Sequence, residues 1–521
     1  MEVYMKFLSS VLAVLCILSG NEVFAEMNLH SNKEPGELVY IDSMHPGTSG
    51  IHEFCSYKAG VLQSYKLVQK LSGPKSIFLA RMALTASYVG DAMLPDGSTV
   101  ADFFGDWGSV IPPDHSLYLV TYKSTDAKGR PATLSGLVVV PDAGGTMPEP
   151  VGILVFMHAT TTQRDNAPGS RSVVTYAAIT AFANSKVVLA MPDYLGYGAN
   201  TGDHPYALGK LNAPSGRSII IAARELMGKL RRSVGDNIYI TGYSEGGGNA
   251  MWLTRYLEER NEATLLPTCS APMSGPYDLT GATAMSFIAA QPPLENQENF
   301  TYKPVLISFA ASSMSKLINR TPLDSLIKAP LALQAKGLFP GTLADETLGV
   351  RLLTTAMNDL NYIAASGSSY SVNPRNLMQD ALVEAIENQD MTYPGMKLWA
   401  ENDAVDWIPK TPILLIGVLQ DSLVPFASSN YPMPEPWKAV KALPPPYASG
   451  NAQNVISSMR KKGINADMVA WTAFNGLVND DAEGRPYSVK ISHSNGFIPS
   501  SIIAQSYFFY PETPIPQLRD P

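Results

Sequence analysis

The sequence predicts an α/β fold in which a mostly parallel central sheet is flanked by helices and carries an inserted, mainly helical segment. Residues 151–157 and 186–191 are short, almost wholly apolar runs, which are typical of parallel strands covered on both faces. A helical pattern follows at 215–232, so strands and helices alternate. The strand-like runs 265–273 and 412–419 are separated by roughly 140 residues, far more than one crossover helix requires. This gap predicts the insertion.

Composition limits the class of protein. The 521 residues are 45% hydrophobic and 16% charged, which is typical of a globular protein with one large domain or two ordinary ones. The formal net charge of -8 is mildly acidic, and this argues against nucleic acid or an anionic membrane as the main partner. The sequence shows no metal-ligand cluster, P-loop or dinucleotide fingerprint, so we expect no cofactor.

Residues 1–25 have the pattern of an export signal peptide. A lysine precedes the apolar run 7–18, and Val23-Phe-Ala25 offers small residues at the cleavage positions. The apolar run is too short to span a bilayer, and Leu15 before Cys16 disfavours a lipid anchor. We therefore expect a soluble exported protein, either secreted or periplasmic.

Two cysteines, Cys55 and Cys269, remain after the signal peptide is removed. Export would permit a disulfide between them. Cys269 lies in an apolar run, where a buried free thiol is equally natural. Both interpretations stay open.

The remaining chain divides into four segments. We expect an N-terminal extension packed on the core over residues 26–113, with a helix at about 61–88. The core occupies 114–284 and resumes over 409–521. The insertion between these two parts, residues 285–408, is called the cap.

Alternation and helical spacing place further elements within these segments. The runs 117–122 and 132–140 flank a turn at 126–130 and predict an antiparallel hairpin that opens the sheet. The helices expected in the cap are 305–317, 322–338 and 377–388. The elements expected near the end of the chain are a helix at 451–462, a strand at 466–472 and a helix at 500–509.

The stretch around Ser244 is predicted to carry the chemistry. A β-branched run at 237–241 meets Gly242-Tyr-Ser-Glu-Gly246, and a helical pattern follows at 250–259. This strand, turn and helix fit the G-x-S-x-G nucleophile elbow, in which a sharp turn lifts the serine hydroxyl clear of the sheet. Glu245 needs to supply only its backbone N–H to the chemistry, and its carboxylate complements the dipole of the following helix.

A serine nucleophile needs a histidine base and a carboxylate that orients the histidine. In the order serine, acid, histidine the base comes last, and of the seven histidines only His493 follows Ser244. Asp421 directly follows the strand-like run 412–419 and is the favoured acid. Asp278, which follows the preceding strand-like run, is the alternative.

An oxyanion hole needs two backbone N–H donors. We expect one of them to be the amide of Glu245. The other should be the amide of Thr160 or Thr161, in the loop after the apolar run 151–157. His158 lies in the same loop, and we expect it to anchor the loop rather than to transfer a proton.

These motifs resemble those of the α/β-hydrolases, and in particular the exported lipase A-like (secretory lipase) group of esterases. The resemblance covers roughly residues 114–510. It rests on Gly-Tyr-Ser-Glu-Gly-Gly at 242–247, Pro192-Asp-Tyr-Leu-Gly-Tyr-Gly198 with His204-Pro-Tyr206, Asp421-Ser-Leu-Val-Pro425, and the late His493. The chain departs from the group at 158–161, which read His-Ala-Thr-Thr where relatives often have His-Gly-Thr.

The resemblance implies an exported lipase or esterase that hydrolyses a carboxylic ester through an acyl-enzyme on Ser244, with a small-molecule or lipid ester as its partner. Acyl transfer by the same triad, exported peptidase activity and a non-catalytic binding protein on a hydrolase fold are the alternatives. Because the cap is inserted near the carboxyl ends of the strands, we expect it to roof the serine and to favour an apolar acyl chain.

Overall fold

The computed structural model describes residues 39–40, 59–72, 114–142, 149–290, 297–319, 321–366, 369–432, 447–480, 486–512, 515 and 517–521. The export signal expected at 1–25 lies outside these residues, and so does Cys55. The signal peptide and the pairing of Cys55 with Cys269 therefore stay predictions. No helix within the described residues has the length and apolar character needed to cross a membrane.

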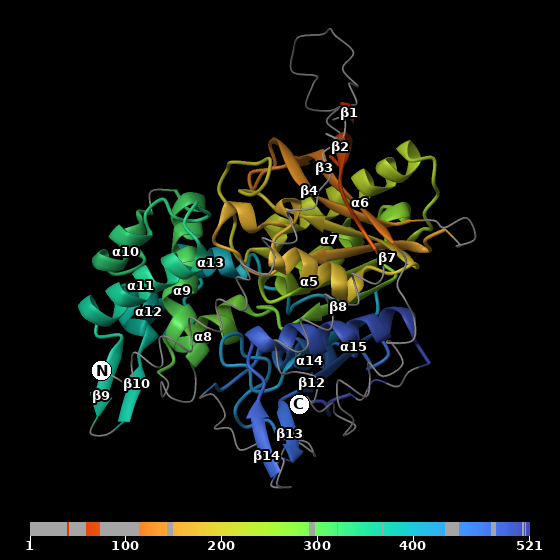
Figure 1. Ribbon diagram of the computed structural model, residues 1–521. Helices are drawn as coiled ribbons and strands as arrows, with labels where there is room; N and C mark the ends of the chain where they lie inside the picture. Colours follow the sequence, from red (N-terminus) through yellow and green to blue (C-terminus); the bar gives the residue numbers. More distant parts are fainter. Residues whose placement is uncertain are drawn as a thin grey trace.

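A ten-stranded sheet built from strands along most of the chain forms the centre of the fold (Figure 1). The strands lie in the order β1-β2-β3-β4-β6-β5-β7-β8-β11-β12. The strands from β6 to β12 in this order run parallel, and β1 to β4 pair antiparallel beside them. The sheet is thus mostly parallel, as predicted. The strands are β1 Val39–Tyr40, β2 Leu62–Leu71, β3 His115–Thr125, β4 Pro131–Pro141, β5 Gly152–Met157, β6 Val187–Pro192, β7 Asn237–Tyr243, β8 Cys269–Met273, β11 Ile413–Val418 and β12 Val469–Phe474.

Helices cover both faces of this sheet. The crossover from β5 through α5 to β6 runs across the sheet in one direction and the crossover from β6 through α6 to β7 runs back, so α5 and α6 lie on opposite faces. α6 packs against α7, and α5 packs against α15. Strands β5 and β6 are buried along their whole length between these layers. The helices are α5 Val173–Phe182, α6 Gly209–Lys229, α7 Glu245–Arg260, α14 Asn451–Lys461 and α15 Phe497–Phe509.

The strand order reverses its direction between β5 and β7. These strands are neighbours in the sheet although β6 lies between them in the chain. The chain leaves β5 toward β6 on one side and leaves β7 toward β8 on the other side. The loops after β5 and β7 therefore part at a topological switch point, which is where open α/β sheets bind ligands.

The helix predicted at 61–88 is wrong over Leu62–Leu71, which forms strand β2. β2 pairs antiparallel with β3, with two register shifts along its length. Shifts of this kind disturb the alternation of side chains between the two faces, so a period of two is not visible in the sequence. Pairing with β3 decides the conformation instead. Residues 73–88 lie outside the described part of the chain.

The described part of the cap is mainly helical, and its helices lie together beside the sheet (Figure 1). They share a hydrophobic core distinct from that of the sheet, and Tyr206 and Leu208 from outside the cap contribute to it. α8, which begins at Ala284, leads into the cap. The elements are α8 Ala284–Ile288, α9 Gln297–Leu317, α10 Ala329–Ala335, α11 Asp345–Asp359, β9 Ile363–Ser366, β10 Ser369–Val372, α12 Asp380–Glu387 and α13 Pro394–Ala400.

The cap helices predicted from the sequence agree only partly with these elements. The helices predicted at 305–317 and 377–388 are confirmed as α9 and α12, with other starting points. The single helix predicted at 322–338 is wrong, because a 3₁₀ turn at Leu323–Ser325 is followed by a separate helix, α10. Pro330 lies in the first turn of α10, where its missing N–H costs nothing and its fixed φ favours a new helix start.

The end of the chain follows its predicted order of helix, strand and helix. The predictions at 451–462, 466–472 and 500–509 are confirmed as α14, β12 and α15 within a few residues. The antiparallel hairpin predicted near the start of the sheet is confirmed as β3 and β4. An additional hairpin, β13 Gly476–Asp480 with β14 Pro486–Lys490, precedes His493.

Candidate active site

Ser244 occupies a tight turn between β7 and α7. Its φ is 57° and its ψ is -122°, a conformation that residues other than glycine rarely adopt. A Cβ atom at Gly246 would lie 2.0 Å from the carbonyl oxygen of Met157, and one at Gly242 would lie 2.3 Å from the carbonyl oxygen of Gly246. Only glycine fits at these two positions, and this lets α7 begin directly against the end of β5.

His493 reaches Ser244 from the last part of the chain. It follows the β13–β14 hairpin and precedes α15. Its Nε2 lies 2.8 Å from Ser244 Oγ. Its backbone carbonyl accepts a hydrogen bond from the hydroxyl of Tyr243, the residue before the serine. Tyr243 therefore holds the histidine loop against the elbow.

The carboxylate beside His493 belongs to Asp421. Its Oδ2 lies 2.5 Å from His493 Nδ1. Its Oδ1 accepts backbone N–H groups from Leu423 at 2.9 Å and from Val424 at 2.8 Å. Because Nδ1 donates to this carboxylate, Nε2 is left as the acceptor for the hydroxyl proton of Ser244.

Asp278, the alternative acid, occupies a different place. Its carboxylate accepts two backbone N–H groups of the turn that follows it, at 3.1 and 2.9 Å, and the side-chain amide of Asn454 at 2.5 Å. These contacts cap the start of that turn. The structure thus brings Asp421, and not Asp278, to His493.

The loop after β5 lies against the elbow. A Cβ atom at Gly246 would lie 2.6 Å from the carbonyl oxygen of His158. The amides of Glu245, Thr160 and Thr161 donate to no acceptor within the described residues. The three amides that the sequence singles out as oxyanion donors are therefore available to bind an oxyanion.

His158 holds this loop in the way that the sequence suggests. Its Nδ1 lies 2.8 Å from the Ala159 carbonyl oxygen and its Nε2 lies 3.3 Å from the Asp193 carbonyl oxygen. The ring stacks on Tyr194, with the two ring centroids 4.0 Å apart. Burial lowers the pKa of His158 to about 4, so the ring is neutral near pH 7 and is poorly suited to accept a proton there.

The side chain of Glu245 has a partner that sequence reasoning missed. The sequence predicts an acid that complements a helix dipole, whereas the structure buries this side chain and places its Oε1 2.7 Å from His204 Nε2. His204 lies in the His-Pro-Tyr motif that carries the family resemblance. That motif was a usable signal, but nothing in the sequence links it to Glu245.

Lys303 is a second residue that sequence reasoning missed. This lysine of cap helix α9 is completely buried. Its Nζ donates to Ser286 Oγ at 3.0 Å and to the carbonyl oxygen of Leu423 at 3.2 Å. Burial lowers the pKa of Lys303 to about 7, although the nearby Asp421 acts in the opposite direction. The cap thus contacts the loop that carries Asp421 through a buried amine.

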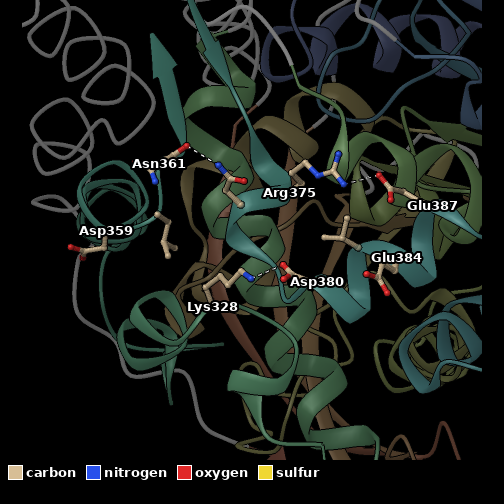
Figure 2. Close-up of a pocket in the computed structure, with 10 residues that line it drawn as sticks. Lys328, Asp359, Asn361, Arg375, Asp380, Glu384 and Glu387 are labelled. Carbon is tan, nitrogen blue, oxygen red and sulfur yellow. Dashed lines mark hydrogen bonds and ion pairs between the residues drawn. The ribbon is translucent and has the colours of Figure 1, made fainter.

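A separate hollow of about 550 Å³ lies within the cap (Figure 2). Its lining includes none of Ser244, His493 and Asp421. Two ion pairs lie in its lining. Lys328 Nζ lies 2.7 Å from Asp380 Oδ1, and Arg375 Nη2 lies 2.8 Å from Glu387 Oε1. The hollow is therefore polar, with both of its cations engaged in ion pairs, and is distinct from the candidate site.

The sheet order, the flanking helices and the elbow after β7 define an α/β-hydrolase fold, and solved structures match this chain over most of its length. A protein from Legionella pneumophila is 21% identical with a TM-score of 0.61, and the match covers 86% of this chain and 97% of that chain. The rice cell wall degrading esterase LipA from Xanthomonas oryzae is 20% identical with a TM-score of 0.59, covering 88% of this chain and 100% of that chain.

More distant structures add nothing to this result. Candida antarctica lipase A is 13% identical with a TM-score of 0.44 over 71% of this chain and 73% of that chain, a likeness too low to carry an argument. No family model matches the sequence, and no curated protein matches it. At these identities the comparisons establish the fold, and the chemistry has to be argued from the site.

The burial of Lys303 predicts a pH dependence of stability. Its pKa is lower in the folded protein, about 7, than the roughly 10.4 of an unfolded chain. Between these values the unfolded chain binds more protons, so the free energy of unfolding rises with pH, by up to about 1.4 kcal/mol per pH unit. We therefore expect the stability of the wild type relative to Lys303→Met to increase from pH 7 to pH 9 in urea unfolding. A difference that stays constant or decreases would contradict the burial of a neutral amine.

Proposed function

We propose that this chain is an exported serine hydrolase that cleaves carboxylic esters, of the lipase or esterase type, through an acyl-enzyme on Ser244. The observation that carries the proposal is the hydrogen-bonded series from Asp421 Oδ2 to His493 Nδ1 and from His493 Nε2 to Ser244 Oγ. A serine held at φ 57° by flanking glycines adds support. So does the presence of an esterase among the structures with the same fold.

The reaction follows from the roles of these atoms. Ser244 Oγ attacks the ester carbonyl carbon while His493 Nε2 takes the hydroxyl proton, and the Asp421 carboxylate stabilises the resulting imidazolium. His493 then gives the proton to the leaving alcohol, which leaves an acyl ester on Ser244. Water attacks this ester, with His493 again taking a proton, and the carboxylic acid and the free serine are formed.

The oxyanion that forms in each step needs donors at the elbow. The amide of Glu245 is the first N–H of α7, and the first N–H groups of a helix have no partner within it. The amide of Thr160 or Thr161 is the proposed second donor, because its loop lies against the same turn. One such donor contributes roughly 10²- to 10³-fold to the rate.

Export and the substrate class belong to the same proposal. Export rests on the signal pattern at residues 1–25, with the periplasm or the medium as the destination. The substrate is proposed to be a small-molecule or lipid ester, and the chemistry needs no cofactor because serine, histidine and carboxylate supply the nucleophile, the base and its orientation.

Removal of the nucleophile or of the base should abolish turnover. Ser244→Ala and His493→Ala should each reduce kcat on p-nitrophenyl butyrate by roughly 10⁴-fold or more, because the members of such a triad act as one unit. Circular dichroism and the thermal midpoint should stay near those of the wild type. Near-normal turnover by either folded variant would contradict the mechanism.

Asp421→Asn and Asp278→Asn form a matched pair of substitutions in two buried carboxylates. Asp421→Asn should lower kcat by about 10⁴-fold, because the amide no longer stabilises the imidazolium or fixes the tautomer of His493. Asp278→Asn should lower the thermal midpoint with little effect on kcat, since that carboxylate caps a turn and contacts Asn454 but not His493. Steady-state kinetics of both variants measure the two values of kcat. A larger loss of kcat in Asp278→Asn than in Asp421→Asn would identify Asp278 as the acid.

The cap is expected to set the preference for the acyl chain. Apolar residues of both α9 and α10, such as Phe309 and Leu331, lie in the cap's own hydrophobic core. We place the acyl chain beneath α9 because this helix contacts both the Asp421 loop through Lys303 and the segment at Tyr206 through Ser313.

An apolar acyl chain beneath α9 should bind more tightly as it lengthens, by up to about 0.8 kcal/mol for each buried methylene. We therefore expect kcat/KM on p-nitrophenyl esters to rise from acetate to butyrate or hexanoate, with little cleavage of peptide amides. A flat or falling acyl series would count against an apolar acyl site. Faster cleavage of aminoacyl amides would favour a peptidase.

A further inference from the structure

One short loop connects the elbow with the cap. It comprises residues 203–208, between β6 and α6, and we call it the bridging segment. His204 of this segment contacts Glu245, the residue after the nucleophile. Tyr206 of the same segment contacts cap helix α9. Neither contact takes part in the proton transfers of the proposed reaction.

The contact between His204 and Glu245 is buried and shares one proton. His204 Nε2 lies 2.7 Å from Glu245 Oε1, with the two side chains 0% and 1% exposed. His204 Nδ1 lies 3.0 Å from the Leu195 carbonyl oxygen, and because a carbonyl oxygen only accepts, Nδ1 carries a proton. A second proton must lie between Nε2 and Oε1.

This contact fixes the residue that is proposed to supply an oxyanion donor. The amide N–H of Glu245 and its carboxyl group belong to one residue in the first turn of α7. Oε1 also accepts the backbone N–H of Ala207 at 3.2 Å. Two hydrogen bonds from the bridging segment therefore hold the side chain, and they restrict movement of the amide that belongs to the same residue.

Tyr206 extends the connection to the cap and to the second oxyanion loop. Its backbone N–H donates to Ser313 Oγ of α9 at 3.1 Å. Its ring stacks on Phe309 of α9, with the centroids 4.2 Å apart and the planes at 7°. Its hydroxyl lies 3.3 Å from Thr160 Oγ1. The bridging segment thus contacts both places from which oxyanion donors are proposed to come.

We propose that Glu245, through its side chain, and His204 are positioning residues that orient the oxyanion donors, and that the bridging segment links this orientation to cap helix α9. The inference rests on the proposed function. Neither side chain needs to touch the substrate. Removing the contact between Glu245 and His204 weakens binding of the transition state and leaves binding of the substrate almost unchanged. A pair that only stabilises the fold would not separate the effect on kcat from the effect on KM in this way.

The test uses Glu245→Ala, His204→Ala and the double variant, assayed on p-nitrophenyl butyrate. We expect kcat to fall roughly ten- to a hundredfold, because a displaced donor loses part of its contribution, while KM changes by less than about threefold. A trifluoromethyl ketone, which forms a tetrahedral oxyanion on the serine, should bind more weakly by a similar factor. The fall in kcat of the double variant should be no greater than that of the more impaired single variant, because both substitutions remove the same contact.

Two further variants separate positioning from stability. Glu245→Gln should restore kcat only in part relative to Glu245→Ala, because an amide oxygen in the place of Oε1 still accepts from Ala207 but requires His204 Nε2 to donate, at the expense of the Nδ1 contact with Leu195. Glu258→Ala is the matched control, since Glu258 is a buried carboxylate of the same helix whose Oε1 accepts the backbone N–H groups of Lys410 at 2.9 Å and Thr411 at 2.6 Å. It should lower the thermal midpoint and leave kcat unchanged.

The outcomes distinguish this inference from the proposed function. An active wild type whose Glu245→Ala variant keeps kcat, or loses no more than Glu258→Ala, overturns the positioning role alone. A wild type that cleaves no ester and binds no trifluoromethyl ketone overturns both. If the alanine variants do not fold, Glu245→Gln replaces them: a fall in kcat at constant KM relative to the wild type supports the positioning role, and an unchanged kcat overturns it. Tyr206→Phe, which removes one oxygen and keeps the ring stack, tests the link to Thr160 in the same way.

Discussion

The close approach of the first turn of α7 to the end of β5 is the constraint on which the rest of this structure depends. Gly246 leaves no room for a Cβ atom beside the carbonyl oxygen of Met157. The chain can make this approach only through a sharp turn, and Ser244 takes a strained conformation there, at φ 57°. As a result the hydroxyl of the serine faces His493, and the first amide of the helix lies beside the loop after β5.

The groups around this turn are held by contacts between distant parts of the chain. Asp421 is oriented by two amides of its own loop, and a carbonyl of that loop accepts from Lys303 of the cap. Glu245 is held by the bridging segment, which Ser313 of the cap contacts in turn. Lys303 and Ser313 are ten residues apart on α9, or about 15 Å along the helix. One cap helix therefore extends from the acid loop to the segment that holds the elbow.

The sequence predicts much of this fold because its strands and helices carry local patterns. The apolar β5 and β6, the elbow and the late histidine can all be read from composition and order alone. Strand β2 could not be predicted, because two register shifts conceal its alternation and pairing with β3 determines it. The break before α10 has a local signal, because Pro330 favours the start of a new helix.

The same reasoning explains which residues of the candidate site could be found. Chain order alone selects His493 as the partner of Ser244. Asp421 and Asp278 both follow strand-like runs, and only the resemblance of the Asp421 loop to the acid-bearing loop of the α/β-hydrolases favours Asp421. The partner of Glu245 lies 41 residues away in the chain and the partner of Lys303 lies 120 residues away. No periodicity or motif specifies such contacts, which exist only once distant parts of the chain have packed together.

Covalent trapping by an organophosphonate ester tests the central claim most directly, since only an activated serine should react. The wild type should gain the mass of one phosphonyl group, and peptide mapping should place it on Ser244. Ser244→Ala should gain none, and His493→Ala should react far more slowly. The absence of an adduct on the folded wild type, or an adduct on a residue other than Ser244, would contradict the account.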